Sequence, residues 1–402
     1  MPSAVAGDNA VSLTENCIVS EPKIDKMKIT TKRSEMKLSL GIALIKKLCS
    51  ETKTNFVISP LSLGTAFTML SAGLKGDTKK EVLSFVGSTD EAVLHKMYSD
   101  IIKNNELPFK IVNKYLAHDD CQVQAKFDNL LREKYESEIE LVNFSKDRKK
   151  VVAETNTWVA STTNKIIKQL LDAEALTADT ILLLLNAVCF KGSWMEEFDN
   201  LPALMDFRLR DGTKVKKHFM TKESGDFKYF DTDHLRTVKI MYRETESYMV
   251  IAIPLDEKKH IDEIIAKMTA AEMFRILDKL YKPNGPDIVL TMPKFKINFK
   301  YKSIVDHMQA LGVKKIFSAG EGDFGELFKK SPGPCKLSPV IHQAVIEVDE
   351  KGSEAEAAAA TRFSPLSGVV EGPIKITIDR PFYFAIHTRG NLASLSGICY
   401  QP

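Results

Sequence analysis

The chain has 402 residues, of which 44% are hydrophobic, and it carries 56 Lys and Arg against 53 Asp and Glu, a formal net charge of +3. This composition is typical of a globular chain with a substantial core, and so small a net charge gives no argument for a nucleic-acid or membrane partner. No apolar run approaches the ~20 residues that a membrane-spanning helix needs.

Residues 1–33 are polar, lack hydrophobic periodicity and do not show the basic and apolar regions of a signal peptide. We expect a flexible arm here, followed by one domain over residues 34–402. No stretch rich in Pro, Gly or Ser divides that domain. The sequence leaves both an extracellular (secreted) and a cytoplasmic location open.

Helices predominate in the first part of the chain. Leu40, Leu44 and Leu48 recur at i+4 spacing, which predicts an amphipathic helix. Ser59 and Pro60 are typical of the N-cap and the first position of the next helix. The buried stripe expected on that helix consists of Leu63, Phe67 and Leu70. Further helices are predicted over residues 90–103, 124–135, 154–171 and 301–312.

Strands predominate from Thr180 onward. The run TILLLLNAVCF (180–190) is continuously apolar, which predicts a strand that is buried on both faces. Further strands are predicted over 248–255, 287–297, 340–348, 374–379 and 382–387, and the chain closes as a hairpin around 389–391. Because helices come first, antiparallel-type strands follow and no regular βα alternation is present, the predicted fold class is α+β.

The sequence does not contain a recognisable catalytic, metal or cofactor motif. GEGDFG (320–325) matches GxGxxG by letter, but it follows a helix rather than a strand, which favours a surface loop. His342 lies between apolar residues of a predicted strand, which favours a hydrogen-bonded core histidine over a catalytic base. The six cysteines form no CxxC pair, and we expect free thiols. We therefore expect no enzyme activity, no cofactor and no metal.

The stretch DEKGSEAEAAAATRFSPLSG (349–368) has a high helix propensity in its centre, yet it directly follows a predicted strand. With the period of a strand, one face carries only small side chains, those of Ser353, Ala355, Ala357, Ala359 and Thr361. The opposite face carries Glu354, Glu356, Ala358, Ala360 and Arg362. Such a segment is tolerable as a loop and well suited to enter a packed sheet as a strand, with Gly352 as a backbone pivot.

From about residue 35 to the C-terminus the chain resembles the serpins. The resemblance rests on NFVISPLSLGTAFTMLSAGLKGDT, NTWVASTTNKI, LLLLNAVCFKGSWMEEF, MPKFKI, VIHQAVIEVDEKGSEAEAAAAT and DRPFYFAI, in this order. It implies a single α+β domain with about nine helices and three β-sheets, a metastable native state and an exposed reactive-centre loop over about 350–373. One departure from the family pattern is Asn164 where glycine is usual, an exchange that the left-handed region of the backbone allows.

The resemblance implies a serine protease inhibitor that acts as a suicide substrate. A protease would cleave the reactive bond Leu366–Ser367, and the cut loop would insert into the main sheet and trap the protease covalently. Leu366, preceded by Pro365, is suited to chymotrypsin-like, elastase-like or cathepsin G-like enzymes, with Arg362 and Phe363 as alternatives if the register slips. The implied state is a monomer that is able to form loop–sheet polymers.

Three groups of residues match positions that the family uses for loop insertion. The hinge, where the loop leaves its strand, matches Glu350, Gly352, Ser353, Glu354, Ala355, Ala357 and Ala359. The shutter, a polar cluster beneath the sheet, matches Ser59, Ser62, Asn186 and His342. The breach, at the top of the sheet, matches Trp194 and Lys294, the latter paired with Glu350. The alternative is a non-inhibitory serpin such as a chaperone, carrier or storage protein, but those usually carry bulky or charged hinge residues.

Overall fold

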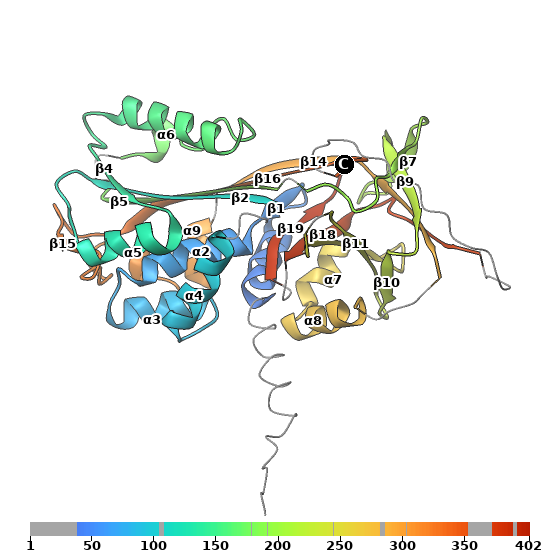
Figure 1. The fold of residues 1–402 in the computed structure, drawn as a ribbon, viewed down its shortest axis with the longest axis horizontal. Coiled ribbons are helices and arrows are strands. Elements are labelled where there is room, and N and C mark those ends of the chain that lie inside the picture. The colour runs from blue at the N-terminus through green and yellow to red at the C-terminus, as the bar shows by residue number, and fades with distance from the viewer. Residues whose placement is uncertain are drawn as a thin grey trace, which may run out of the picture.

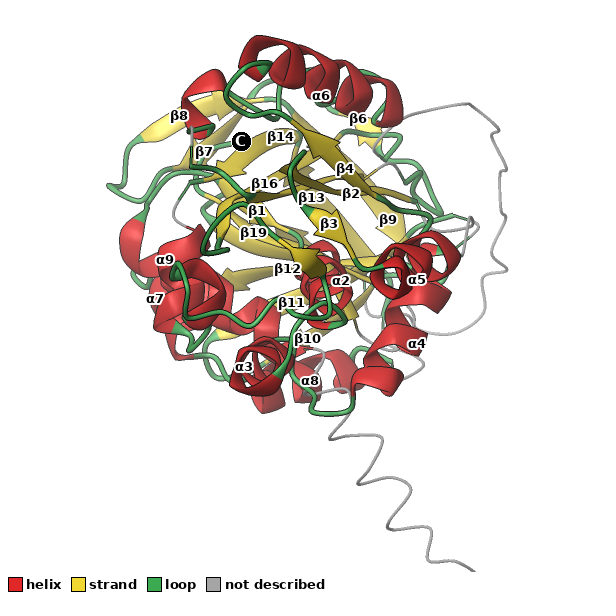
Figure 2. Cartoon of the chain, turned by 90° about the vertical axis from the view of Figure 1, so that its left-hand side faces the viewer, coloured by secondary structure: helices red, strands yellow, loops and turns green. Residues whose placement is uncertain are grey.

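The structure is a computed structural model that describes residues 38–103, 108–177, 179–190, 192–243, 245–281, 286–302, 304–352, 372–388 and 392–402. Strands lie at the centre of the molecule and helices surround them (Figure 2). The described strands form sheets of six, five and four strands and two small ribbons. This part of the chain also contains nine α-helices. The predicted α+β class with three main sheets is confirmed, while the arm over 1–33 lies outside the described residues.

The five-stranded sheet, called the main sheet below, runs along the length of the molecule (Figure 1). Its strands, in spatial order, are β14 (Phe295–Tyr301), β16 (Leu337–Val348), β5 (Leu182–Phe190), β2 (Phe109–His118) and β4 (Ile139–Val142). Every residue of β5 is buried, as its apolar run predicts. Helix α6 (Arg148–Thr162) covers one face of this sheet, and α2, α5 and α9 lie on the opposite side (Figure 1).

The other sheets lie beside the main sheet. The six-stranded sheet consists of β1 (Phe56–Ile58), β19 (Leu392–Cys399), β18 (Phe382–Thr388), β12 (Tyr248–Pro254), β11 (Leu235–Met241) and β10 (Lys228–Asp231). The four-stranded sheet consists of β17 (Ile374–Thr377), β13 (Ile288–Pro293), β9 (Phe219–Ser224) and β6 (Asp199–Asn200). The ribbons pair β7 (Met205–Arg208) with β8 (Lys214–Lys217), and β15 (Phe328–Lys330) with β3 (Gln122–Val123).

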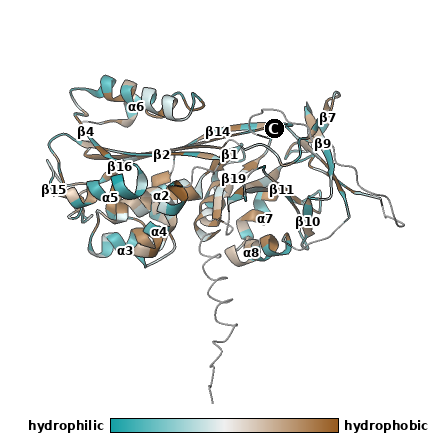
Figure 3. Ribbon diagram, in the orientation of Figure 1, coloured by the Kyte–Doolittle hydropathy of each residue, from teal (hydrophilic) through white to brown (hydrophobic). Residues whose placement is uncertain are grey.

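Helix α2 (Pro60–Ser71) forms the centre of the molecule. Ser59 is its N-cap and accepts a hydrogen bond from the Ser62 amide, as the sequence predicts. All its residues are buried, not only the predicted stripe, because it packs against strands of both the main and the six-stranded sheets. Hydrophobic residues are frequent on α2 and the strands, whereas α6 shows teal, brown and near-white stretches side by side (Figure 3).

The remaining helices are less completely buried than α2. They are the helix over 38–51, α3 (Gly76–Phe85), α4 (Glu91–Ile102), α5 (Ala125–Tyr135), α7 (Ile261–Lys267), α8 (Ala270–Lys279) and α9 (Ile304–Ala310). Leu40, Leu44 and Leu48 of the first helix are buried as expected. Among the described residues, none of the helices combines the length and the apolar character that crossing a membrane requires.

Several sequence-based expectations need correction. The predicted helix over 154–171 begins earlier, at Arg148, and ends at Thr162; Asn164 then adopts a left-handed φ of 51°. The segment 287–297 forms two strands in different sheets, β13 and β14, with Lys294 between them. The pairs β16–β5, β2–β4 and β13–β17 are parallel, not antiparallel.

The five cysteines within the described residues are buried thiols that form no disulfide bond, as expected. They are Cys49, Cys121, Cys189, Cys335 and Cys399.

The GEGDFG stretch forms a turn between the 3-10 helix Lys315–Phe317 and β15, with Gly320 at a φ of +79°. It therefore does not connect a strand to a helix in the way a dinucleotide site requires.

Candidate functional site

The two central strands of the main sheet are directly paired. β16 and β5 run parallel, from Leu337 opposite Leu182 to Val345 opposite Cys189. At the end of β16 the backbone reverses, because the amides of Asp349 and Gly352 donate to each other's carbonyls over 2.9 and 3.3 Å. Gly352 also bridges to Ser193. The hinge therefore begins directly above the junction of the two strands.

The four predicted shutter residues lie in one fully buried polar cluster at this junction. His342 of β16 and Asn186 of β5 are opposite each other, and the imidazole Nδ1 is hydrogen-bonded to the Asn186 Oδ1. The Asn186 amide donates to the hydroxyl of Ser62 over 2.7 Å and to its carbonyl over 3.1 Å. The backbone N–H of Ser59 donates to the imidazole Nε2 over 3.2 Å. The cluster thus links both central strands to the N-terminus of α2.

Burial lowers the pKa of His342 from 6.5 to about 3. The imidazole is therefore neutral at physiological pH, with one nitrogen that donates and one that accepts. Because Nε2 accepts from Ser59, the proton belongs on Nδ1, which donates to Asn186. A protonated ring would have two donors and would turn the contact with Ser59 into a repulsive one.

Two members of this cluster were missed at the level of sequence. The Asn186 amide is also hydrogen-bonded to Asn113 Oδ1 on the neighbouring strand β2, where the two residues are in register. The Ser59 hydroxyl donates to the Ser394 carbonyl of β19 over 2.6 Å. The sequence carries no local signal for either contact, since the first depends on the register between β5 and β2 and the second is made to a backbone carbonyl.

Trp194 anchors the top of the sheet. Its ring is fully buried and stacks on Tyr242, with centroids 4.6 Å apart and planes at 10°. Its indole N–H donates to the Asp349 carbonyl over 2.9 Å, and its backbone N–H donates to the Lys351 carbonyl over 3.1 Å. The aromatic pair thus holds the turn that follows β16.

Lys294 and Glu350 form an ion pair of 2.5 Å at the same place. The hydrogen bond from Lys294 is the main cause that lowers the pKa of the Glu350 carboxyl. Both side chains are partly exposed, so the pair contributes little to stability by itself. Its position fixes the start of β14 to the end of β16.

Gly352 occupies a position that only glycine fits. Its φ is +122°, and a Cβ there would lie 2.2 Å from the Gly192 carbonyl oxygen and 2.6 Å from the Ser193 Cα. Both the backbone conformation and the close approach of a second chain segment therefore exclude a side chain.

The other predicted hinge and loop residues lie outside the described residues. They are Ser353, Glu354, Ala355, Ala357, Ala359, Arg362, Phe363, Pro365, Leu366 and Ser367.

Among the residues that the structure covers, His118, Asp119 and Asp120 are the group whose ligand atoms are close enough to share a cation. These three are consecutive at a partly exposed turn, where acidic groups are common without an ion, and they share no residue with the shutter or the breach.

Comparison with known proteins identifies the family. Residues 35–400 match the family model Serpin (serine protease inhibitor). Ipis-1 of Ixodes persulcatus is 30% identical over 87% of this chain and 94% of its own length. Antichymotrypsin-2 of Bombyx mori is 28% identical over 87% of this chain and 92% of its own length.

Solved structures show the same fold. Native tengpin, a thermophilic serpin, has a TM-score of 0.80 at 24% identity and covers 96% of each chain. Human thyroxine-binding globulin also has a TM-score of 0.80, at 23% identity over 93% of this chain and 99% of its own. From its sequence match and its architecture, the chain belongs to the serpin family.

Proposed function

We propose that this chain inhibits a serine endopeptidase as a suicide substrate. The observation that carries the proposal is the alternation of small residues from Ser353 to Thr361, directly after Gly352. One strand face made only of small side chains is suited to enter between two strands that are already packed. The direct pairing of β5 and β16 supports the proposal, because no other strand lies between them where the new strand would enter.

The strand directions fit such an insertion. The backbone reverses at residues 349–352, so a strand formed by the following residues would run opposite to β16. Because β5 is parallel to β16, the new strand would be antiparallel to both neighbours. One parallel ladder would be replaced by two antiparallel ladders, which gains hydrogen bonds and buried area. Residues 353–366 would span roughly 46 Å as a strand at ~3.3 Å per residue.

Trapping would use the ordinary first step of the protease. The protease serine hydroxyl attacks the carbonyl of Leu366, an ester forms, and the amine of Ser367 leaves with the proton. Insertion would then carry the esterified protease along with Leu366 before water hydrolyses the ester. The chain itself supplies the substrate and the stored free energy, and no catalytic residue.

The proposed target is a chymotrypsin-like enzyme, with elastase-like and cathepsin G-like enzymes as related choices. Leu366 is the large apolar side chain at the proposed bond, which suits an apolar specificity pocket. The name of the relative antichymotrypsin-2 is in line with this choice, although the argument for this chain rests on its own Leu366.

The test is to incubate the chain with chymotrypsin and to separate the products on a denaturing gel. A covalent band near the summed masses is expected. Only a cleaved band, at every ratio of protease tried, would overturn inhibition of this enzyme class and favour a non-inhibitory serpin. An inactive chymotrypsin that lacks its nucleophilic serine is the control, and it should give neither band.

A further inference from the structure

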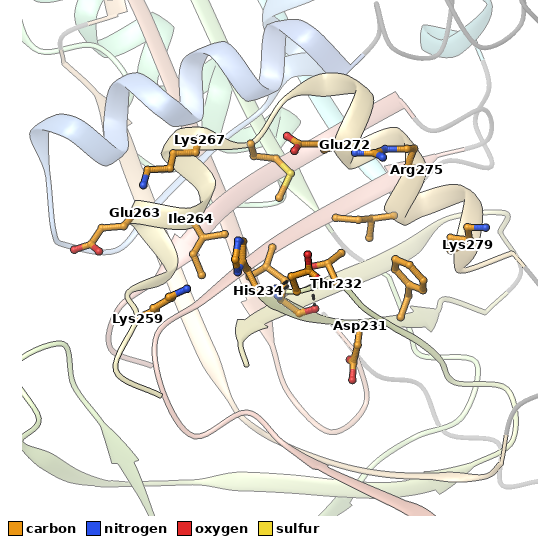
Figure 4. Close-up of a pocket in the computed structure, with 15 residues that line it drawn as sticks. Asp231, Thr232, His234, Lys259, Glu263, Ile264, Lys267, Glu272, Arg275 and Lys279 are labelled. Atoms are coloured by element: carbon orange, nitrogen blue, oxygen red, sulfur yellow. Dashed lines mark hydrogen bonds between the residues drawn. The ribbon is translucent and has the colours of Figure 1, made fainter. Parts of the chain in front are cut away.

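A cavity of about 630 Å³ lies between α7, α8 and the turn that joins β10 to β11 (Figure 4). It shares no residue with the shutter, the breach or the hinge. Its volume is within the range of small-molecule sites, roughly 300–1,000 Å³. The turn that forms one wall is held by the Thr232 hydroxyl, which accepts from the amides of His234 and Leu235 over 3.3 and 3.0 Å.

The floor of this cavity is apolar. Leu235, Met268 and Ile276 are buried, and Phe230 and Ile264 are half-buried. These side chains come from the hairpin and from both helices, so the apolar surface is continuous across three elements. A ligand that fits here needs an apolar body.

Four exposed cations surround the floor. Lys259 precedes α7, Lys267 ends it, and Arg275 and Lys279 lie on α8. In Figure 4 these side chains stand around the opening from different sides. Within the described part of the chain, no carboxylate lies within 4.0 Å of any of the four cationic groups. The hydrogen bonds from Thr269 are the main cause of the lowered pKa of Glu272 and Arg275 is a lesser cause, so the charge of Arg275 is partly compensated. The charges of the three lysines are available to a ligand.

Three of the four acidic side chains in the lining are already engaged. Asp231 is bound by both Arg236 Nε and Nη2, over 3.0 and 2.7 Å. Glu263 is paired with Arg210 over 3.2 Å. Glu272 accepts from both the amide and the hydroxyl of the helix cap Thr269 over 2.8 Å.

The fourth acid, Asp233, is exposed on the turn. Two of the four lining carboxylates, Asp231 and Glu263, are thus paired with arginines from outside the cavity, whereas Glu272 and Asp233 keep their charge beside four cations. This asymmetry favours an anionic over a cationic ligand.

We propose that this cavity binds a small amphipathic anion, with an aliphatic or aromatic body on the floor and a carboxylate, sulfate or phosphate among the four cations. The apolar floor accounts for the body and the unpaired cations account for the head group. The proposal is independent of protease inhibition, because the cavity and the main-sheet site share no residue.

The test is titration calorimetry of the full chain with dodecanoate below its micellar concentration. Dodecyltrimethylammonium, which has the same tail and the opposite charge, is the matched probe. We expect saturable binding of dodecanoate with a stoichiometry of one and at least about tenfold weaker binding of the cationic probe. Binding of dodecanoate should weaken as salt is added, since the contacts of the head group are exposed.

Variants locate the site. Lys267→Gln combined with Arg275→Gln should weaken dodecanoate binding about fivefold, which is the effect of removing two exposed charge contacts. Ile264→Glu places a negative charge on the half-buried floor and should reduce binding by more than about tenfold. Lys96→Gln, on α4 with 82% of its side chain exposed, is the matched control and should bind as the parent does.

Three results would overturn the proposal. They are no saturable binding of dodecanoate, equal binding of both probes, and equal loss in Lys96→Gln and in the double variant. Unfolding curves of each variant accompany the titrations, so that a variant which does not fold is replaced by Ile264→Gln. Inhibition of chymotrypsin by the double variant should be unchanged, which separates this site from the proposed inhibitory function.

Discussion

Gly352 lies where two chain segments meet at the top of the main sheet. Its φ of +122° is unfavourable for any L side chain, and the Gly192 carbonyl occupies the space of a Cβ. Gly212 offers a natural comparison, because its φ of +87° is also positive but no atom lies within 4 Å of its Cβ position. The two positions therefore separate backbone strain from close contact.

We predict that Gly352→Ala destabilises the protein more than Gly212→Ala does. Gly212→Ala should cost about 1 kcal/mol, the ordinary penalty of a left-handed residue, and Gly352→Ala about 2–4 kcal/mol because the backbone must also move. The measurement is the first unfolding transition in urea for the parent and both variants. Equal shifts would mean that the turn above the sheet adapts without cost.

Leu366 is the residue on which the proposed specificity depends. We predict that Leu366→Arg moves inhibition from chymotrypsin to trypsin, because the side chain at the cleaved bond enters the specificity pocket. Association rates with both enzymes measure the change, and sequencing of the released peptide locates the cut. A break after Phe363 in the parent would contradict the assignment of the bond.

At the scale of elements, the pair β5–β16 is held to α2 by a polar cluster whose hydrogen bonds require a neutral His342. The pKa of His342 is lowered to about 3 in the folded protein, while an unfolded histidine titrates near ~6.5. Between these two values the unfolded chain binds one proton more than the folded protein does. The contribution of His342 to the stability of the folded protein is therefore fully present above about pH 6.5 and is lost as the pH falls toward 3.

We predict that His342 lowers the free energy of unfolding of the native protein by about 2–3 kcal/mol between pH 7.5 and pH 4.5. Other groups titrate in the same window, so the matched variant is His342→Gln, which keeps polar atoms but has no proton to gain. The pH dependence of the urea midpoint should be clearly flatter in His342→Gln. If parent and variant lose stability in parallel, His342 does not control the junction.

The elements differ in how far their sequence predicts them. β5 was predictable because eight of its nine residues are apolar, which leaves no amphipathic helical alternative, and α2 because Ser59 and Pro60 mark its start. The two strands within 287–297 were not separable, since their apolar pattern continues through Lys294 while the backbone moves from one sheet to another. The parallel pairing of β5 and β16 also left no trace in either strand, because pairing depends on connections that are distant in sequence.

The candidate site divides in the same way. Ser59, Ser62, Asn186 and His342 were named through a family pattern, and the structure brings them into one cluster. Asn113 and Ser394 contact the same cluster through register and through a backbone carbonyl, respectively, and neither kind of contact has a residue-type signature. The cavity beside α7 and α8 was likewise not predictable, because it depends on which exposed cations find no partner.

At the scale of the whole molecule, the proposed mechanism requires a native state that is not the most stable arrangement of the chain. We predict that cleavage within the loop raises the thermal midpoint by tens of degrees, because an added strand brings many hydrogen bonds and contacts at once and each ~1 kcal/mol shifts the midpoint by some degrees. Differential scanning calorimetry before and after cleavage measures this. Identical midpoints would contradict insertion.

The outcome of each encounter with a protease depends on a race between loop insertion and hydrolysis of the ester. The difference between the two barriers decides it, tenfold for every ~1.4 kcal/mol. In the proposed strand, Ser353 is the first residue that points toward the core, so its burial directly affects the insertion barrier. A hydroxyl is buried at little cost when it finds one partner, whereas an arginine without a designed partner costs several kcal/mol.

We therefore predict that Ser353→Arg turns the chain from an inhibitor into a substrate. If half of a ~4 kcal/mol cost appears in the barrier, insertion slows roughly thirtyfold and hydrolysis wins most encounters. Glu356→Arg, three residues along on the opposite face of the strand, is the matched control and should still trap chymotrypsin. The readout is the number of inhibitor molecules consumed per protease trapped, together with the ratio of covalent to cleaved bands. Trapping by Ser353→Arg at close to one to one would exclude insertion through this hinge as the mechanism. Insertion would have to bury the arginine, and it would then be too slow to precede hydrolysis of the ester.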